Sequence, residues 1–176
     1  MRLTEAVARL FFAVWPPEEV AEPLRGLHRK DQRGVRFVPP ENWHITLRFL
    51  GECHAGAVFA AMEGTTFSPA LAHLGPAVDV IAERALVVPV AGVDGLAAEV
   101  TKRTSAIGEQ PRKRFTGHLT IARLKANVPM PRVLGELVSA EFAVTEVALV
   151  ESRLHPQGAR YETLATWAVA LDEQTR

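Results

Sequence analysis

Two short segments of this chain resemble each other closely: "HITLRFL" at residues 44–50 and "HLTIARL" at residues 118–124. β-Branched and other apolar residues dominate both segments, which predicts a β-strand in each case. Side chains alternate between the two faces of a strand, so the histidine and threonine of each segment lie on one face and apolar residues on the other. The fold therefore has to bury one face of each strand while leaving a polar face accessible.

The two histidines, His44 and His118, are 74 residues apart (118 − 44 = 74). One His-x-Thr match carries little information, whereas two copies with apolar residues at matching positions indicate a duplicated architecture. Each copy also follows a predicted strand and helix of similar composition. We therefore expect two pseudo-symmetric halves, and coincidence is the alternative.

Short strands and short helices alternate along the rest of the chain. We predict strands at 9–14, 84–90, 142–150 and 161–171, helices at 18–28, 55–63 and 93–107, and loops at 34–42 and 65–76, the second loop with room for one short strand. Pro89 favours an edge or an end for its strand. Asp94 is a candidate N-cap and Gly108 a candidate stop for the third helix. This order predicts an α+β fold in which helices cover the sheets.

Composition limits the class of protein and its partners. The 176 residues suffice for one domain or two joined lobes, and 48% hydrophobic against 23% charged residues argues against long disorder. The formal net charge is zero, so a polyanion has to be held locally, and the basic run at 112–114 is either a solvated loop or a phosphate contact. Cys53 has no intramolecular disulfide partner, and no segment is typical of a signal peptide or a membrane span. We expect a cytoplasmic protein without membrane contact.

The two motifs favour acid–base chemistry on a phosphate. If both strands face one cleft, two imidazoles and two hydroxyls converge there. The pKa of histidine lets one ring act as a base and the other as an acid near pH 7, and threonine hydroxyls donate to phosphate oxygens. Neither motif carries a carboxylate ligand, so we expect no metal and no cofactor. A metal hydrolase and a non-catalytic RNA-binding module are the rival classes.

The motif pair resembles that of a known family. The segments "RLFFAV", "VPPENWHITLRFLGE", "HLTIAR" and "ESRLHPQGARYETL" occur in the order and spacing of the two-histidine phosphoesterases, specifically the RNA 2',3'-cyclic phosphodiesterases, also called 2'-5' RNA ligases. The resemblance covers nearly the whole chain. It implies one bilobal domain over residues 1–176, in which antiparallel sheets line a central cleft and the helices lie outside. It also implies hydrolysis of a ribose 2',3'-cyclic phosphate to a 2'-phosphate, with 2'-5' joining of RNA ends as the reverse reaction.

Carried onto this chain, the resemblance assigns roles to five residues. It implies that one of His44 and His118 activates water, that the other protonates the leaving 3' oxygen, and that Thr46 and Thr120 hold the phosphate. We favour His118 as the base and His44 as the acid, and the reverse assignment is the alternative. Arg123 matches a basic position near that phosphate. Strict alternation turns Arg123 away from the motif face, so this role requires a bend, and a surface salt bridge is the alternative.

Other residues and substrates are less closely defined. Phe11 and Tyr161 are candidate platforms for a nucleobase, with Trp43 and Phe115 as further candidates, although such aromatic residues are more often part of a core. Arg48 has the parity of the first motif and is a candidate for the motif face, although the family does not require it, and a charge at the rim of the cleft is an equally good interpretation. We expect a monomer acting on RNA ends that carry a 2',3'-cyclic phosphate. Small cyclic nucleotides and ADP-ribose cyclic phosphate are the alternative substrates.

Overall fold

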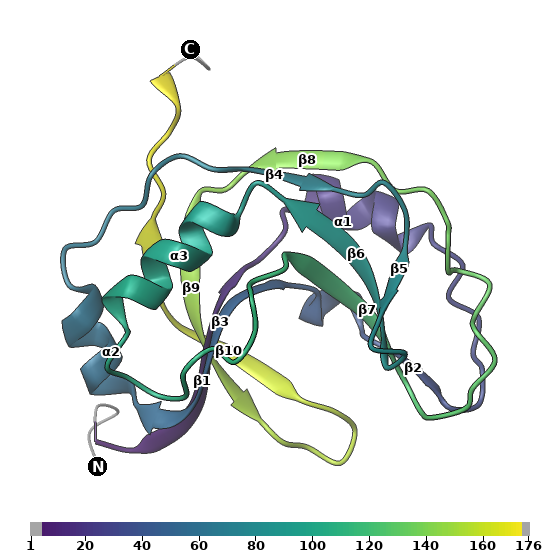
Figure 1. The fold of residues 1–176 in the computed structure, drawn as a ribbon, viewed down its shortest axis with the longest axis horizontal. Helices are drawn as coiled ribbons and strands as arrows, with labels where there is room; N and C mark the ends of the chain where they lie inside the picture. The colour runs from purple at the N-terminus through teal and green to yellow at the C-terminus, as the bar shows by residue number, and fades with distance from the viewer. Residues whose placement is uncertain (1–4, 174–176) are drawn as a thin grey trace.

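The structure, a computed structural model, describes residues 5–173 as an α+β fold (Figure 1). Its elements are, in chain order, β1 (Val7–Val14), α1 (Glu18–Arg25), β2 (Val35–Phe37), a 3-10 turn (Pro40–Asn42), β3 (Ile45–His54), α2 (Ala55–Met62), β4 (Leu71–Leu74), β5 (Asp79–Ile81), β6 (Ala85–Ala91), α3 (Asp94–Arg103), β7 (His118–Leu124), β8 (Ala140–Ala143), β9 (Glu146–Arg153) and β10 (Arg160–Ala168). None of these helices is long and apolar enough to cross a membrane.

The strands form two halves that meet at the two motif strands. The order is β10-β9-β1-β3-β7-β6-β4-β8, with β2 beside β7 and β5 beside β6, and the paired strands are antiparallel. The junction of β3 and β7 is the residue pair Ile45 and Leu119, which directly follow the two motif histidines. The predicted bilobal α+β fold is confirmed, and the curled sheet brings both motifs to the line where its halves join.

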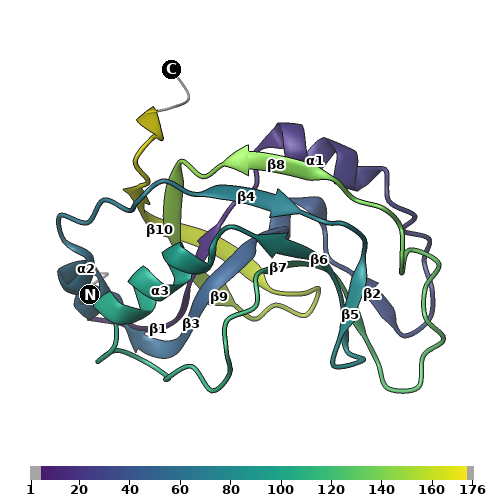
Figure 2. The ribbon, with the colours of Figure 1, turned by 45° about the horizontal axis from the view of Figure 1, so that its top comes forward.

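Helices cover both halves, and one apolar core runs through them. α2 and α3 pack on the half that contains β1 and β3, whereas α1 lies against β8 of the other half (Figures 1 and 2). Buried side chains of both halves, such as Phe12, Leu86, Leu119 and Leu149, belong to the same hydrophobic cluster. The halves are therefore parts of one packed unit.

A β-bulge interrupts the alternation of β3 just after its motif. Two successive residues of β1 pair with Thr46 and Arg48, and Leu47 between them has no partner. One extra residue shifts the side chains that follow it to the opposite face, here as far as a second register shift at Leu50. Arg48 is therefore buried on the core side, and Phe49 faces the same cavity as Thr46.

β7 carries a bulge at the equivalent position. Two successive residues of β6 pair with Thr120 and Ala122, which leaves Ile121 as the extra residue. The reversal brings Arg123 to the face of the second motif. This bulge is the bend that Arg123 needs in order to share the face of His118 and Thr120, and both bulges lie three residues after a motif histidine.

Some predicted elements have other boundaries than expected. The predicted loop 34–42 contains β2, because Val35–Phe37 pairs with β7. The predicted strand 142–150 is two strands, β8 and β9, which lie in different halves of the sheet. Local sequence predicted extended chain in this region correctly, whereas the crossing between halves depends on partners far away in the chain.

The third helix and the strand before it also differ from the prediction. α3 ends at Arg103 rather than at Gly108, and its N-cap residue is Val93 without a side-chain cap, so the prediction for Asp94 was wrong. β6 is an interior strand between β7 and β4, so of the two positions expected for Pro89, an edge or an end, the structure shows the end. Pro89 is tolerated there because it lies near the end of β6, opposite His118.

Candidate active site

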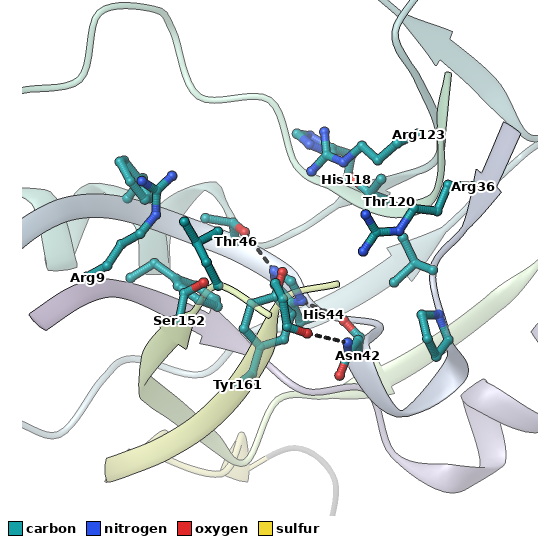
Figure 3. Close-up of a pocket in the computed structure, with 16 residues that line it drawn as sticks. Arg9, Arg36, Asn42, His44, Thr46, His118, Thr120, Arg123, Ser152 and Tyr161 are labelled. Atoms are coloured by element: carbon teal, nitrogen blue, oxygen red, sulfur yellow. Dashed lines mark hydrogen bonds between the residues drawn. The ribbon is translucent and has the colours of Figure 1, made fainter. Parts of the chain in front are cut away.

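Both His-x-Thr motifs face one cavity of about 420 Å³, here called the motif cavity (Figure 3). Its walls come from β1, β2, β3, β7 and the β9–β10 hairpin. The lining residues are Arg9, Phe11, Arg36, Val38, Pro39, Asn42, His44, Thr46, Phe49, His118, Thr120, Arg123, Ser152, Leu154, Ala159 and Tyr161. The structure thus brings together all seven residues that we expected at the site.

The two imidazoles are held in the same way. Nδ1 of His44 lies 2.7 Å from the carbonyl oxygen of Asn42, and Nδ1 of His118 lies 2.7 Å from that of Thr116, in each case two residues earlier in the chain. A carbonyl oxygen only accepts hydrogen bonds, so Nδ1 carries the proton in both rings. Nε2 is then the reactive nitrogen of each histidine, and Thr46 Oγ1 lies 3.1 Å from Nε2 of His44.

The environment of His44 disfavours its charged form. Burial lowers the pKa of His44 below its ordinary value of 6.5, and nearby Arg123 and His118 lower this pKa further, while the hydrogen bond to the Asn42 carbonyl opposes them. In the free protein the His44 ring is accordingly neutral at pH 7. A bound phosphate anion would favour the protonated ring.

Aromatic side chains enclose the His44 ring. The ring centroids of Phe11 and Tyr161 lie 5.0 Å and 5.1 Å from that of His44, and Trp15 lies 5.5 Å away. Trp15 Nε1 donates to Thr163 Oγ1 at 3.2 Å. Phe11 and Tyr161 therefore form a wall that orients the His44 imidazole. Trp15 is the third residue of this wall, although the sequence indicated only that a strand ends beside it.

Three arginines line the motif cavity, two of which the sequence analysis missed. Arg36 pairs with Arg123 across β2 and β7, and the guanidinium carbon of Arg9 lies 4.8 Å from the ring centroid of Phe49. Figure 3 shows Arg9 on the opposite side of His44 from Arg36 and Arg123. Arg9 lies on the same face of β1 as Phe11, and this parity could have indicated its position at the cavity. No such signal was available for Arg36, because β2 was predicted to be part of a loop.

The chemistry of the lining favours an anion. Among its described residues there are three arginines and two histidines but no Asp, Glu or Cys. Within residues 5–173, no group of three or more His, Cys, Asp or Glu side chains is arranged to hold a metal ion. A phosphate in this cavity would meet cations on several sides, because the arginines come from three different strands.

Arg48 and Trp43 lie away from the cavity, contrary to their candidate roles. Arg48 is 3% exposed and donates to the carbonyl oxygens of Thr104 at 2.6 Å and Ile107 at 2.9 Å. It fastens the C-terminal end of α3 to the back of β3 rather than forming the rim of the cleft. Trp43 is 1% exposed and belongs to the hydrophobic core, so it offers no surface to a nucleobase.

Comparisons with known proteins agree with this geometry. A family model described as LigT like Phosphoesterase matches residues 14–69. The RNA 2',3'-cyclic phosphodiesterase of Thermus thermophilus is 33% identical over 186 residues, covering 92% of this chain and 90% of that protein. The protein of the same name from Aeropyrum pernix is 31% identical over 147 residues, covering 74% of this chain and 84% of that protein.

Solved structures show the same architecture. The crystal structure of Escherichia coli LigT complexed with 3'-AMP superposes with a TM-score of 0.77 at 25% identity, covering 94% of this chain and 100% of that chain. A crystal structure from Thermus thermophilus superposes with a TM-score of 0.70 at 31% identity, covering 91% of this chain and 97% of that chain.

Two halves that each present a His-x-Thr motif to one cavity are the architecture of a two-histidine phosphoesterase. Within that superfamily, the chain belongs to the LigT-like phosphoesterase family.

Proposed function

We propose that this protein is an RNA 2',3'-cyclic phosphodiesterase that converts a ribose 2',3'-cyclic phosphate into a 2'-phosphate. The observation that carries the proposal is the pair of equivalent His-x-Thr motifs, His44 with Thr46 and His118 with Thr120, around one cavity that also contains Arg123. Relatives that cover most of the chain are named RNA 2',3'-cyclic phosphodiesterase, which supports the same substrate class. Both histidines come from one chain, so the proposal requires only a monomer, which we place in the cytoplasm.

The reaction is an in-line displacement at phosphorus. A water oxygen forms a new bond to phosphorus while the bond between phosphorus and the 3' oxygen breaks. One histidine Nε2 takes a proton from the water, and the other gives a proton to the departing 3' oxygen. Thr46, Thr120 and Arg123 donate hydrogen bonds to the non-bridging oxygens, whose negative charge has to be held through the transition state. If the 5'-hydroxyl of a second RNA replaces water, the product is a 2'-5' phosphodiester.

The expected assignment makes His118 the base and His44 the acid. An acid has to be protonated at the start of the step, and the lowered pKa of free His44 works against this. The negative charge of the bound phosphate raises that pKa again, so substrate binding itself would recharge His44. The reverse assignment, with His44 as the base and His118 as the acid, is the alternative. A substrate with a different leaving group distinguishes the two assignments.

The proposal is tested with purified protein, an excess of chelator, 2',3'-cyclic nucleotides, and a short RNA that ends in a 2',3'-cyclic phosphate. We expect a 2'-phosphate product, identified by phosphorus NMR, and a loss of about 10²- to 10⁴-fold in kcat for His44→Ala and for His118→Ala. His73→Ala is the matched control, because His73 is exposed and pairs with Glu141 on β8. A 3'-phosphate product, loss of activity with chelator, or full activity of both cavity variants would overturn the proposal.

A further inference from the structure

We propose that a groove beside α3 binds the single-stranded RNA that precedes the terminal cyclic phosphate; this inference rests on the proposed function. The groove, here called the α3 groove, has a volume of about 1050 Å³ and lies between β3, α3 and the segment 109–116. It shares Thr46, Phe49 and His118 with the motif cavity, so the two spaces are continuous. A substrate whose last nucleotide occupies the motif cavity can extend directly into it.

The charge of the α3 groove suits a phosphodiester chain. Lys102 in the last turn of α3 and Arg112, Lys113 and Arg114 in the loop are exposed, and within residues 5–173 none of them takes part in an ion pair or a side-chain hydrogen bond. Two acidic residues, Asp94 and Glu109, also line the groove. The exposed charged side chains of its lining therefore carry a net charge of +2 (4 − 2). The chain as a whole has no net charge, so this excess beside the motif cavity is a local feature.

Between these cations the α3 groove has an apolar floor. Its apolar lining consists of Leu47, Phe49, Ala97, Ala98, Pro111 and Phe115. Sites that bind single-stranded nucleic acid without reading its sequence combine cations for the backbone with apolar and aromatic surface for the bases. The groove has both parts, which favours an RNA chain over inorganic anions or a purely apolar ligand.

The fold holds the beginning of the basic loop in place. The buried guanidinium of Arg48 donates to the carbonyl oxygens of Thr104, Ile107 and Glu109, and the amide of Glu109 donates to the carbonyl oxygen of Leu50 at 2.8 Å. The loop from α3 to β7 is therefore attached to β3 at Glu109, three residues before Arg112. Figure 2 shows this segment passing beside β3 on its way from α3 to β7.

A second hollow next to the motif cavity offers less to an RNA chain. It shares Arg36 and Arg123 with the cavity, has a volume of about 280 Å³ and adds one cation, Lys125. Its smaller volume and single additional charge make it a poorer path for several nucleotides. The geometry therefore directs the chain past Phe49 into the α3 groove.

The inference is tested by comparing 2',3'-cyclic AMP with a ten-nucleotide RNA that ends in a 2',3'-cyclic phosphate. We expect the double variant Arg112→Ala/Arg114→Ala to lower kcat/KM for the RNA on the order of tenfold, and to affect the mononucleotide far less. Loss of two phosphate contacts should also reduce the slope of log kcat/KM against log salt concentration by about 1.4, since each contact to a single strand contributes about 0.7.

Two control variants separate the α3 groove from the remaining basic surface of the protein. Lys30→Ala/Arg132→Ala removes two exposed cations that line a separate hollow and should leave the ratio of the two substrates unchanged. Lys125→Ala tests the second hollow and should leave the preference for RNA intact. An unchanged ratio in the groove variant, an equal loss on both substrates, or a loss of the preference in Lys125→Ala would overturn the inference. If the wild-type protein hydrolyses neither substrate, the proposed function fails, and fluorescence anisotropy with an RNA ending in a 2'-phosphate then tests the groove by itself.

Discussion

The reactivity of single side chains here depends on what surrounds them. Both imidazoles donate from Nδ1 to a carbonyl oxygen two residues earlier, and yet only His44 is enclosed by Phe11, Trp15 and Tyr161. The aromatic wall lowers the exposure of His44 and its pKa, and leaves a neutral base form in the free protein. The shared motif thus sets the same hydrogen bond for both rings, whereas the aromatic surroundings lower the pKa of His44.

The lowered pKa of His44 predicts how stability depends on pH. Between the folded pKa and the unfolded value of 6.5, the unfolded chain binds more protons, so the free energy of unfolding rises with pH through that window. Acidification from pH 7.5 to pH 5 should therefore lower the urea midpoint of the wild-type protein more than that of His44→Gln, which has no titrating group at this position. Equal changes in both proteins would contradict a depressed pKa. His73→Gln is the control for an exposed histidine.

The acid and base roles can be separated by changing the leaving group. A substrate with sulfur in place of the bridging 3' oxygen departs as a thiolate, which needs no proton in the transition state. If His44 is the acid, His44→Ala should recover most of its lost rate on this substrate, whereas His118→Ala should stay about 10²- to 10⁴-fold impaired. Single-turnover kinetics measure both rates. Recovery in His118→Ala instead would assign the acid role to His118.

β-Bulges within the two motif strands decide which face their side chains take. The bulges at Leu47 and Ile121 follow the two motifs at the same distance and reverse the faces of β3 and β7. In β3 the reversal buries Arg48 beneath α3, and in β7 it brings Arg123 into the motif cavity. The same irregularity therefore produces a structural cation in one half and a candidate phosphate ligand in the other.

Arg48 should be worth several times more to stability than an exposed arginine of the same region. Its guanidinium, 3% exposed, donates to four carbonyl oxygens at and beyond the C-terminus of α3, and Arg48→Met removes all four hydrogen bonds. We expect Arg48→Met to cost about 2–4 kcal/mol in the free energy of unfolding, measured by urea denaturation. Arg103→Met is the matched control, because its ion pair with Glu99 at 3.8 Å is exposed and contributes less than about 0.5 kcal/mol. Equal costs for the two variants would show that the buried contacts add nothing.

The molecule as a whole joins its two halves through a narrow strand contact and a broad core. β3 and β7 pair at Ile45 and Leu119, while buried residues of both halves belong to one hydrophobic cluster. The histidines lie at this junction, so neither half alone holds a complete site. Any separation of the halves would separate the two imidazoles.

The continuous core predicts that both halves unfold together. Tryptophan fluorescence and hydrogen exchange of the β6 and β9 amides should give the same urea midpoint, because a shared core makes unfolding cooperative. Leu119→Ala should lower both midpoints equally and cost about 2–5 kcal/mol, since Leu119 is fully buried at the junction. Separate transitions for β6 and β9 would show that the halves are independent domains.

The sequence by itself determined the features that follow from local periodicity. Alternation in 44–50 and 118–124 placed each histidine with its threonine and put Ile45 and Leu119 in the core, and composition predicted most strands and helices. These predictions succeeded because side-chain direction and backbone preference are set by covalent geometry within a few residues. The paired motifs thus identified the candidate site before its three-dimensional surroundings were known.

Only the tertiary structure decided which cations join those histidines. Arg36 reached the motif cavity through a pairing of β2 with a strand more than 80 residues later, and the faces of Arg48 and Arg123 were set by bulges that arise where distant strands pair. The division of 142–150 between the two halves has the same origin. Strand pairing depends on contacts between residues far apart in the chain, and for that reason local sequence does not specify it.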